Sequence, residues 1–471
     1  MDARKFDLVV IGSGPAGEKG AAQAAYFGKS VALIESEEAL GGAAANTGTL
    51  PSKTLRESAL YLSGFRHRGL YGISFELKDK VTARDFLYRE RLVVEKEHER
   101  IDTNIKRHNV ALYHGRARFI DPHTISVSRD GAAPVQIQGD IILIATGSSP
   151  YRPPNFPFED PRVYDSDTIL DIHDIPKSML IAGGGVIGCE YACMFSALGI
   201  RVHLVEGRDC LLGFMDPEIS ETLTNRMRTM GIDILMPDAV EEVVTDTPIK
   251  VRMKSGKTVE VDTILAATGR NGNTGDLGLD AIALETGRRG HLAVNEHYQT
   301  EAGHIYAAGD VIGFPALAAT AMEQARIAMV HAFDLHYKTA LATVLPYGIY
   351  TIPECSMAGE TEQSLTEAGI KFVTGKARYD ENARGQIIGD EDGFIKLLFR
   401  EEDMKLLGVH VIGESASELV HVGLTALLVG AGADLFIHTC YNYPTLTEIY
   451  KYATYDALGA RDRRRAAASE S

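Results

Sequence analysis

The sequence predicts an α/β fold with two Rossmann-like domains followed by a C-terminal α+β domain. Three observations lead to this prediction. A G-x-G-x-x-G pattern follows an apolar strand near the N-terminus, the same pattern recurs at Gly183, and an Ala-Thr-Gly turn closes each copy. A repeated strand, glycine turn and helix is typical of doubly wound parallel sheets, whereas the alternating strands after residue 344 indicate a different final domain.

The first module starts with DLVVIGSGPAG, an apolar strand followed by Gly12, Gly14 and Gly17. A helix through Ala25 and a second strand, SVALIE, which ends at Glu35, complete it. The glycines allow a tight turn and a close approach of the backbone to a pyrophosphate, and an acid after the second strand can accept hydrogen bonds from ribose hydroxyls. The glycine pattern alone is weak evidence, but in this setting it indicates a dinucleotide site.

The rest of the first domain contains both helices and strands. Apolar residues at helical spacing predict helices over about 54–63 and 82–106. The stretch ALYHGRARFIDPHTISV alternates like the strands of a small meander. An apolar strand of the parallel type then stops at Thr146 and Gly147.

A second complete module follows. SMLIAGGGVIGCEYA repeats the pattern at Gly183, Gly185 and Gly188, its partner strand RVHLVE ends at Glu206, and its closing turn spans 267–269. Because each copy has its own acid and its own Ala-Thr-Gly turn, we expect the chain to bind two dinucleotides.

The C-terminal third contributes to two domains. HIYAAGDVIG places Asp310 after an apolar strand, and a helix is expected over 316–333. The last domain begins near Val344, contains strands such as GFIKLLF and LLGVHVI, and ends in helices around 419–430 and 447–458.

Composition limits the possible partners and surroundings. A formal net charge of −16 argues against a nucleic-acid or anionic-membrane surface, which would need basic patches. No apolar run approaches the length of a membrane span, and the first residues leave no room for a secretory leader. The five cysteines form no C-x-x-C pair and no metal site is expected. We therefore expect a cytoplasmic protein that acts on small molecules.

The stretch GGAAANTGTLPSKTLRE, residues 41–57, resembles the redox-active segment of the flavoprotein disulfide reductases. In that family, GG-x-C-x-N-x-G-C-x-PSK places two half-cystines beside the flavin. Ala44 and Thr49 stand at these two positions. Neither side chain can store electrons as a disulfide, so electrons that reach a flavin here must leave by another route.

The resemblance implies FAD in the first domain and NAD(H) or NADP(H) in the second. By position in the family motifs, the FAD-binding residues would be Gly12, Gly14, Gly17, Glu35, Gly42, Lys53, Gly115, Ala117, Thr146, Gly147, Asp310 and Ala318. The residues for the second nucleotide would be Gly183, Gly185, Gly188, Glu206, Arg208 and Gly269.

The resemblance also implies the domain division. The FAD domain would be discontinuous, with segments 1–150 and 271–343 enclosing the NAD(P) domain at 151–270. Residues 344–460 would form the dimerisation domain of a homodimer or a higher oligomer. We expect ARDRRRAAASES, from about 461 to 471, to be a disordered, solvated tail.

Lys53 and Glu190 are the first candidate catalytic residues. They match a lysine and glutamate that pair in the family, and the lysine would attract the negative charge of a reduced flavin. A buried charge of either sign is unfavourable without its partner, so each needs the other. Thr49 would lie where the family's charge-transfer sulfur meets the ring.

A second departure from the disulfide reductases lies in CYNYPTLTEIY. The family has H-P-T-x-x-E there, and its histidine handles protons for the thiol. This chain has Tyr443 in place of that histidine, while Glu448 is retained. A phenol is a poor base for a thiol at neutral pH. The segment around Ala44 and Thr49 and the segment around Tyr443 therefore both depart from the family in the way that loss of the redox disulfide predicts. In the family's dimer, both residues would act from the partner subunit.

This combination resembles the soluble, Si-specific pyridine nucleotide transhydrogenases, which are FAD enzymes of the same fold. The resemblance covers nearly the whole chain up to about residue 458. It implies an oxidoreductase that moves hydride reversibly from NADPH to NAD⁺ through the flavin, without a redox disulfide.

The end of the second nucleotide strand bears on substrate preference. Glu206 suits the ribose diol of NAD and repels a 2′-phosphate, whereas Arg208 would offset part of that repulsion. We predict that NAD(H) binds more tightly than NADP(H) and that both are used.

Two other functions remain open at this point. An NAD(P)H oxidase or quinone reductase of the same fold would also need no redox cysteine. A non-catalytic flavoprotein that serves as a sensor or scaffold is less consistent with Lys53, Glu190 and Glu448, all of which are retained.

Overall fold

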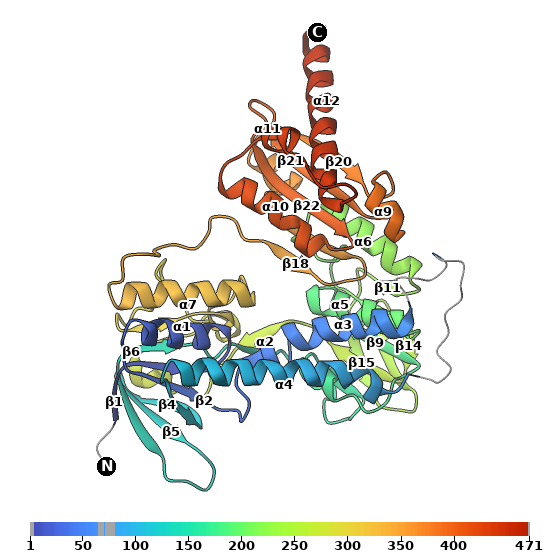
Figure 1. The fold of residues 1–471 in the computed structure, drawn as a ribbon. Helices are drawn as coiled ribbons and strands as arrows, with labels where there is room; N and C mark the ends of the chain where they lie inside the picture. Colours follow the sequence, from blue (N-terminus) through green and yellow to red (C-terminus); the bar gives the residue numbers. More distant parts are fainter. Residues whose placement is uncertain (1–3, 65–69, 71–80, 470–471) are drawn as a thin grey trace.

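The computed structural model describes residues 4–64, 70 and 81–469. Two parallel sheets with helices are followed by an antiparallel sheet with helices, and the third body stands above the second in Figure 1. The predicted fold class is therefore confirmed.

The first module is a sheet whose strands come from distant parts of the chain. Its parallel strands follow the order β3 (Ala111–His114), β2 (Val31–Glu35), β1 (Arg4–Ile11), β6 (Val135–Ile144) and β17 (Ile305–Ala307). Helices α1 (Pro15–Tyr26) and α7 (Ala318–Ala332) lie side by side on one face (Figure 1). Because β17 and α7 follow the whole second module in sequence, the first module is discontinuous.

The predicted meander over residues 111–127 is only partly correct. β4 (Arg116–Asp121) and β5 (Thr124–Ser128) do pair antiparallel and extend the sheet from β6. β3, in contrast, pairs parallel with β2. The reason is topological: the long helix α4 (Ala83–Arg107) lies between β2 and β3 and carries the chain back to the start of the sheet, as parallel pairing requires.

Three helices that follow the first glycine turn in sequence link the first two modules. They are α2 (Gly42–Asn46), α3 (Thr49–Ser63) and α4. Thr82 begins α4 as a capping box with Asp85. Buried residues of α3 and α4 share one apolar core with α5 (Val186–Ala197) of the second module. In this core the ring centroids of Phe86 and Phe195 lie 6.1 Å apart. α3 therefore carries Lys53 to the boundary between the modules.

The second module repeats the architecture of the first. Its parallel sheet has the order β11 (Asp233–Leu235), β10 (Arg201–Val205), β9 (Ser178–Ala182), β15 (Thr263–Ala266) and β8 (Val163–Asp165). Helices α5 (Val186–Ala197) and α6 (Pro217–Thr229) belong to this module. Three antiparallel strands cover it, β12 (Val240–Val244), β13 (Ile249–Met253) and β14 (Thr258–Val261). An antiparallel ribbon of β7 (Ser148–Pro150) and β16 (Arg270–Gly272) connects the two modules.

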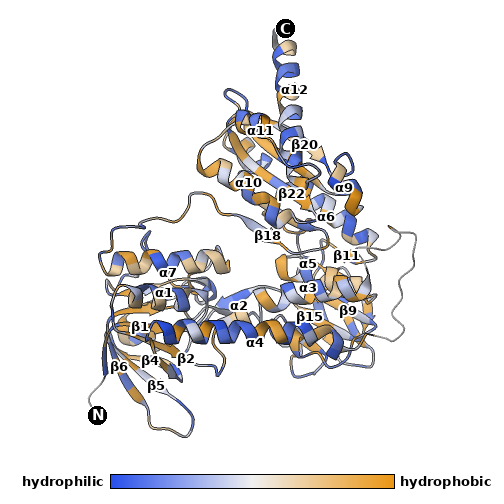
Figure 2. Cartoon of the chain, in the orientation of Figure 1, coloured by the Kyte–Doolittle hydropathy of each residue, from blue (hydrophilic) through white to orange (hydrophobic). Residues whose placement is uncertain are grey.

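The third body is an antiparallel sheet. Its strand order is β18 (Tyr347–Ile349), β19 (Glu354–Gly359), β22 (Leu406–Gly413), β21 (Phe394–Arg400) and β20 (Phe372–Arg378). Its helices are α8 (Glu362–Glu367), α9 (Ala383–Ile388), α10 (Ala416–Leu428), α11 (Ala433–His438) and α12 (Ile449–Ser469). The buried faces of the strands form the apolar interior of this body (Figure 2).

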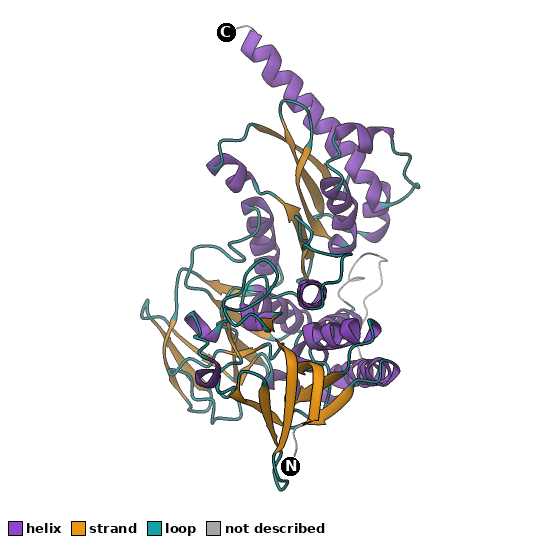
Figure 3. Cartoon of the chain, turned by 90° about the vertical axis from the view of Figure 1, so that its left-hand side faces the viewer, coloured by secondary structure: helices purple, strands orange, loops and turns teal. Residues whose placement is uncertain are grey.

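The expectation of a disordered tail from residue 461 is wrong for the described residues. α12 continues to Ser469 and projects past the sheet (Figure 3). Alanine and arginine, which dominate this stretch, are strong helix formers. Arg464 also ties the helix to the sheet, because its Nη1 donates a hydrogen bond of 2.6 Å to the Phe372 carbonyl.

A buried ion cluster joins the second and third bodies. Lys396 on β21 is 1% exposed, and its Nζ lies 2.8 Å from the Asp216 carboxylate at the start of α6. Glu218 and Glu362 each approach the same Nζ to 3.2 Å. His410, beside Lys396 on β22, is fully buried. The Lys396 ammonium is therefore shared between two carboxylates of the second body and one of the third, which links the two bodies.

Candidate active site

The two glycine turns have the same geometry. Gly12 and Gly183 have positive φ angles of 99° and 111°, and an ideal Cβ on either would lie 2.4 Å from a carbonyl oxygen of the Ala-Thr-Gly segment. A Cβ on Gly17 or Gly188 would lie 1.8 Å from the carbonyl oxygen of the first glycine. No side chain fits at these four positions, so the helix packs directly on the turn in both modules.

The helices that begin at the predicted nucleotide sites have no side-chain caps. α1 begins after Gly14, α5 after Gly185 and α7 at Ala318, and none of these starts has a capping hydrogen bond from a side chain. Side chains cap α4, α6, α8 and α9, whereas α2, α3, α10 and α11 also start without a side-chain cap. The first N–H groups of α1, α5 and α7 therefore remain available to anions such as phosphates.

The acid at the end of each second strand is also held in the same way. Glu35 Oε2 accepts a hydrogen bond of 2.9 Å from the Ser13 N–H, inside the first glycine turn. Glu206 Oε2 accepts one of 2.7 Å from the Gly184 N–H, inside the second. The other carboxylate oxygen, Oε1, accepts a hydrogen bond from the backbone N–H two residues later in the sequence. This N–H belongs to Glu37 in the first module and to Arg208 in the second. Each acid thus fixes its own glycine turn.

The two sites differ at the residue two positions after the acid. Glu37 lies there in the first module, whereas Arg208 lies there in the second and places its Nε 3.0 Å from Glu206 Oε1. Burial alone would raise the pKa of the Glu206 carboxyl, but hydrogen bonds from Arg208 and Gly184 outweigh burial and hold the pKa below its ordinary value. The pair presents little net charge to a ribose.

The segment 41–53 packs against the first glycine turn. Gly42 has a φ of 55°, and a Cβ there would lie 2.9 Å from Gly14 Cα. Asn46 Nδ2 donates to the carbonyls of Leu40 and Gly42 and so closes the turn. Ala44 lies half-buried in α2, and Thr49 is exposed at the first turn of α3. The turn thus keeps its shape without a sulfur at either position.

The buried cysteines do not replace the missing sulfurs. Cys189, Cys193 and Cys355 are buried, and none of the five cysteines is in a disulfide. Burial raises the pKa of the Cys193 thiol to about 12. A thiol with so little thiolate at neutral pH is a poor redox group.

Lys53 meets Glu190 across the boundary between the first two modules. Lys53 Nζ lies 2.7 Å from Glu190 Oε2, and the side chains are 28% and 4% exposed. The other oxygen, Oε1, accepts a 2.9 Å hydrogen bond from the Tyr350 N–H of the third body. The Tyr350 ring lies under the lysine, with Nζ 5.0 Å from its centroid. Three separate segments therefore hold one ammonium group in place.

Asp310, Thr146 and Gly147 lie where the two modules join. Ser148 Oγ donates a 2.8 Å hydrogen bond to Asp310 Oδ2, and Arg270 Nε donates to the same hydroxyl at 2.9 Å. Thr146 Oγ1 donates to the Asn273 carbonyl. Among the described residues, Asp310 Oδ1 accepts no hydrogen bond from the protein, so it is available to a ligand hydroxyl.

Three further predicted FAD residues are placed as follows. Gly115 has a φ of 153° and donates its N–H to the Glu35 carbonyl at 2.8 Å. Ala117 pairs with Val127 on the antiparallel branch. Ala318 opens α7. Gly269, predicted for the second nucleotide, has a φ of 113° and lies against the guanidinium of Arg289.

Tyr443 and Glu448 are not part of this arrangement within one chain. Tyr443 is 74% exposed, next to Pro444, and Glu448 belongs to a short 3₁₀ turn, η6 (Leu446–Glu448), before α12. No hydrogen bond between described residues connects either one with Lys53 or Glu190.

Sequence reasoning missed three residues that support the site, Tyr350, Ser148 and Arg270. Arg270 follows the second Ala-Thr-Gly turn directly and bridges Ser148 to Asp167, with Nη1 3.0 Å from Asp167 Oδ1. Its position next to a motif was a usable signal. Tyr350 contributes both its backbone N–H and the face of its ring, and these contacts form only in the folded chain, so the sequence gives no signal for them.

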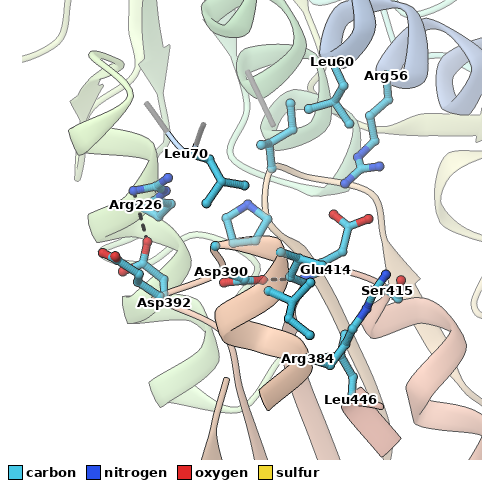
Figure 4. Close-up of a pocket in the computed structure, with 16 residues that line it drawn as sticks. Arg56, Leu60, Leu70, Arg226, Arg384, Asp390, Asp392, Glu414, Ser415 and Leu446 are labelled. Atoms are coloured by element: carbon cyan, nitrogen blue, oxygen red, sulfur yellow. Dashed lines mark hydrogen bonds and ion pairs between the residues drawn. The ribbon is translucent and has the colours of Figure 1, made fainter. Parts of the chain in front are cut away.

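A cavity in the described part of the chain lies apart from these residues. It has a volume of about 500 Å³ and is lined by Arg56, Arg226, Arg384, Asp390 and Asp392 among others (Figure 4). Two of these lining residues, Arg226 and Asp392, form an ion pair of 3.0 Å. None of the predicted site residues lines this cavity.

Comparisons with known proteins match both parts of the chain. Residues 6–325 match the family described as pyridine nucleotide-disulphide oxidoreductase, and residues 345–454 match the dimerisation domain of the same family. A soluble pyridine nucleotide transhydrogenase of Mycobacterium tuberculosis is 46% identical over 457 residues, which cover 97% of each chain. A protein of the same name from Colwellia psychrerythraea is 40% identical and covers 96% of this chain and 98% of its own.

Solved structures agree with the fold. The HOCl-induced flavoprotein disulfide reductase RclA from Escherichia coli aligns with a TM-score of 0.86 at 25% identity, covering 96% of this chain and 99% of its own. LpdA from Mycobacterium tuberculosis aligns with a TM-score of 0.87 at 26% identity over the same shares. No helix in the described part of the chain has the length and apolarity needed to cross a bilayer.

Proposed function

Since the chain belongs to the pyridine nucleotide-disulphide oxidoreductase family, we propose that it is an FAD-dependent transhydrogenase that moves hydride reversibly between NADPH and NAD⁺. One observation carries the proposal: Ala44 and Thr49 leave no redox sulfur in segment 41–53, while the ion pair of Lys53 with Glu190 is intact. The relatives named soluble pyridine nucleotide transhydrogenase support it.

The first module fits FAD. Its glycine turn excludes side chains at Gly12 and Gly17, and the uncapped start of α1 offers N–H groups to a pyrophosphate. Glu35 stands at the end of β2 for a ribose, and Asp310 Oδ1 is available to a hydroxyl of the ribityl chain. When bound, FAD supplies the two-electron chemistry, since it can take up a hydride from one nicotinamide and release it to another.

The second module would bind the two nicotinamide nucleotides in turn. The Gly183 turn and the start of α5 would hold the pyrophosphate, and Glu206 with Arg208 would meet the adenosine ribose. The Glu206 carboxylate favours a ribose diol, and the Arg208 guanidinium offsets repulsion of a 2′-phosphate. Both nucleotides are therefore substrates.

Lys53 would supply positive charge where negative charge develops. Its ammonium group is held by Glu190 and by the face of the Tyr350 ring, so little reorganisation is needed during the reaction. We further propose that the protein acts as a cytoplasmic homodimer in which Tyr443 and Glu448 reach the site of the other subunit. The exposure of Tyr443 on the dimerisation domain supports this part of the proposal.

The test is hydride transfer without oxygen. The FAD-loaded protein is incubated under nitrogen with NADPH and thio-NAD⁺, and thio-NADH is followed by its absorbance. We expect one thio-NADH for each NADPH consumed. If none forms, and NADPH is instead consumed only after oxygen or a quinone is added, the protein is an oxidase or quinone reductase. A flavin that NADPH fails to bleach would indicate a sensor or scaffold.

A further inference from the structure

Arg289 lies directly against the second Ala-Thr-Gly turn. An ideal Cβ on Gly269 would lie 2.5 Å from Arg289 Nη1 and 3.3 Å from Cζ, so the guanidinium occupies the space of a missing side chain. The Tyr151 ring lies on the same guanidinium, with Cζ 5.9 Å from the ring centroid. The Tyr151 N–H donates a 2.9 Å hydrogen bond to the Gly269 carbonyl. The arginine and the turn therefore form one unit.

The first module provides an internal comparison. Gly147 is the equivalent glycine of the first Ala-Thr-Gly turn, and its φ of 68° is also positive. No heavy atom lies within 4 Å of the Cβ position at Gly147. The arginine is thus a feature of the second nucleotide site and not of the turn in general.

The backbone holds Arg289 in an uncommon conformation. Its φ of 62° and ψ of 23° are left-handed, which side chains other than glycine, asparagine and aspartate rarely adopt. The loop is fixed on both sides: the Gly290 N–H donates to the Gly287 carbonyl at 3.1 Å, and Thr274 Oγ1 donates to the Gly290 carbonyl at 2.9 Å. Strain of this kind persists where the surrounding structure imposes it, and it concentrates at functional sites.

The arginine has no acidic partner of its own. Among the described residues, no carboxylate forms an ion pair with Arg289, although the chain as a whole carries a net charge of −16. A planar guanidinium with free donors is well suited to bind phosphate through two parallel hydrogen bonds.

The sheet order shows which part of a nucleotide would lie there. β9, which leads into the glycine turn, lies between β10 and β15. Glu206 and Arg208 follow β10, whereas Gly269 and Arg289 stand at the end of β15, on the other side of the glycine turn. A dinucleotide crosses the carboxyl ends of such strands, so its adenosine ribose lies at β10 and its nicotinamide half at β15. NAD(H) and NADP(H) are identical in that half.

We propose that Arg289 binds the diphosphate of both substrate nucleotides on its nicotinamide side. The inference rests on the proposed function for the identity of the ligand. It assigns discrimination between NAD(H) and NADP(H) to Glu206 and Arg208, and common affinity to Arg289.

The test replaces Arg289 by glycine in the FAD-loaded, full-length protein. Arg289→Gly removes the guanidinium and suits the left-handed backbone, so the variant folds without added strain. Arg288→Gly is the matched control, because Arg288 is exposed and lies in the same loop. Arg289→Lys keeps the charge without the two-pronged geometry. Binding of ADP-ribose and of AMP is measured by calorimetry, and KM is measured for NADH and for NADPH.

We expect Arg289→Gly to weaken ADP-ribose binding about tenfold and to raise both KM values by a similar factor. AMP, which lacks the second phosphate, should bind within about twofold of the parent protein. The ADP-ribose affinity of Arg289→Lys should lie between those of the parent and of Arg289→Gly. The affinity of Arg288→Gly should match that of the parent.

ADP-ribose binding unchanged in Arg289→Gly would overturn the inference, and so would a rise confined to the KM for NADPH. A parent protein that binds ADP-ribose but transfers no hydride would contradict the proposed function alone. The two failures are therefore distinguishable.

Discussion

Lys53 and Glu190 come from different modules, yet their charged groups lie 2.7 Å apart, and the N–H of Tyr350 from the third body completes the contact. The pair thus depends on the relative position of all three bodies. The Lys53 ammonium of this pair is also the positive charge that the proposed hydride transfer would use.

Lys53→Met should therefore affect both stability and rate. Removing one partner of a largely buried pair leaves the Glu190 charge uncompensated, so we expect the free energy of unfolding to fall by about 2 to 4 kcal/mol. Flavin bleaching by NADPH, followed in a stopped-flow spectrophotometer, should slow at least about tenfold. Lys376→Met, which breaks a more exposed pair with Glu218, should cost less than about 1 kcal/mol.

The double variant Lys53→Met/Glu190→Gln separates the pair from the single residues. Because the amide removes the stranded charge, stability should recover by about 1 to 3 kcal/mol relative to the sum of the single effects. Strictly additive losses would mean that the two residues act independently.

Nucleotide preference should follow Glu206 and Arg208. In the parent protein we expect NADH to bind more tightly than NADPH, since the Glu206 carboxylate would lie next to the ribose and repel a 2′-phosphate. Arg208→Gln should weaken NADPH about tenfold and leave NADH nearly unchanged. Arg201→Gln, at the opposite end of β10, is the control. Titration of each reduced nucleotide measures this, and a tenfold preference of the parent for NADPH would contradict it.

Restoring sulfur should not restore disulfide chemistry. Ala44→Cys/Thr49→Cys places both half-cystines, but Tyr443 supplies no base for the thiol. We expect lipoamide or glutathione turnover to be at least about a hundredfold lower than in a triple variant that also carries Tyr443→His. Comparable turnover by the double variant would show that the tyrosine is not the limiting group.

His410 should make the protein less stable in mild acid. Burial lowers the pKa of its imidazole below 6.5, although Asp216 acts in the opposite direction. Below pH 6.5 the unfolded chain binds a proton that the folded chain excludes. The free energy of unfolding therefore decreases as the pH is lowered, by up to about 1.4 kcal/mol per pH unit.

His410→Gln removes that titration. Glutamine can still donate to the Glu360 carbonyl, as His410 Nε2 can at 2.8 Å. Thermal midpoints measured from pH 8 to pH 5 should therefore fall less steeply for the variant than for the parent. Parallel pH profiles would show that His410 takes up its proton in the folded state.

Much of the fold could be predicted because its signals are local. A strand, a glycine turn and an acid lie within one short stretch in each module, and the structure shows the same contacts from Ser13 to Glu35 and from Gly184 to Glu206. The alternation in β3 resembles that of a meander, whereas the crossover through α4 makes the strand pair parallel with β2.

The supporting residues could not be predicted in the same way. Tyr350 contributes a backbone N–H that approaches Glu190 from a different body, and Arg289 reaches Gly269 through a strained loop. Both contacts depend on tertiary approach and on backbone conformation, which no residue pattern encodes. The catalytic roles assigned to Lys53, Glu190, Thr49, Tyr443 and Glu448 remain predictions.

The central claim is that electrons leave the protein through a second nucleotide. The most direct measurement starts from FAD-loaded protein bleached by NADPH under nitrogen, freed of nucleotides and mixed with thio-NAD⁺ in a stopped-flow spectrophotometer. The account predicts that the flavin absorbance returns and thio-NADH appears at the same rate, with one thio-NADH for each flavin. A flavin that stays bleached until oxygen is admitted would contradict it.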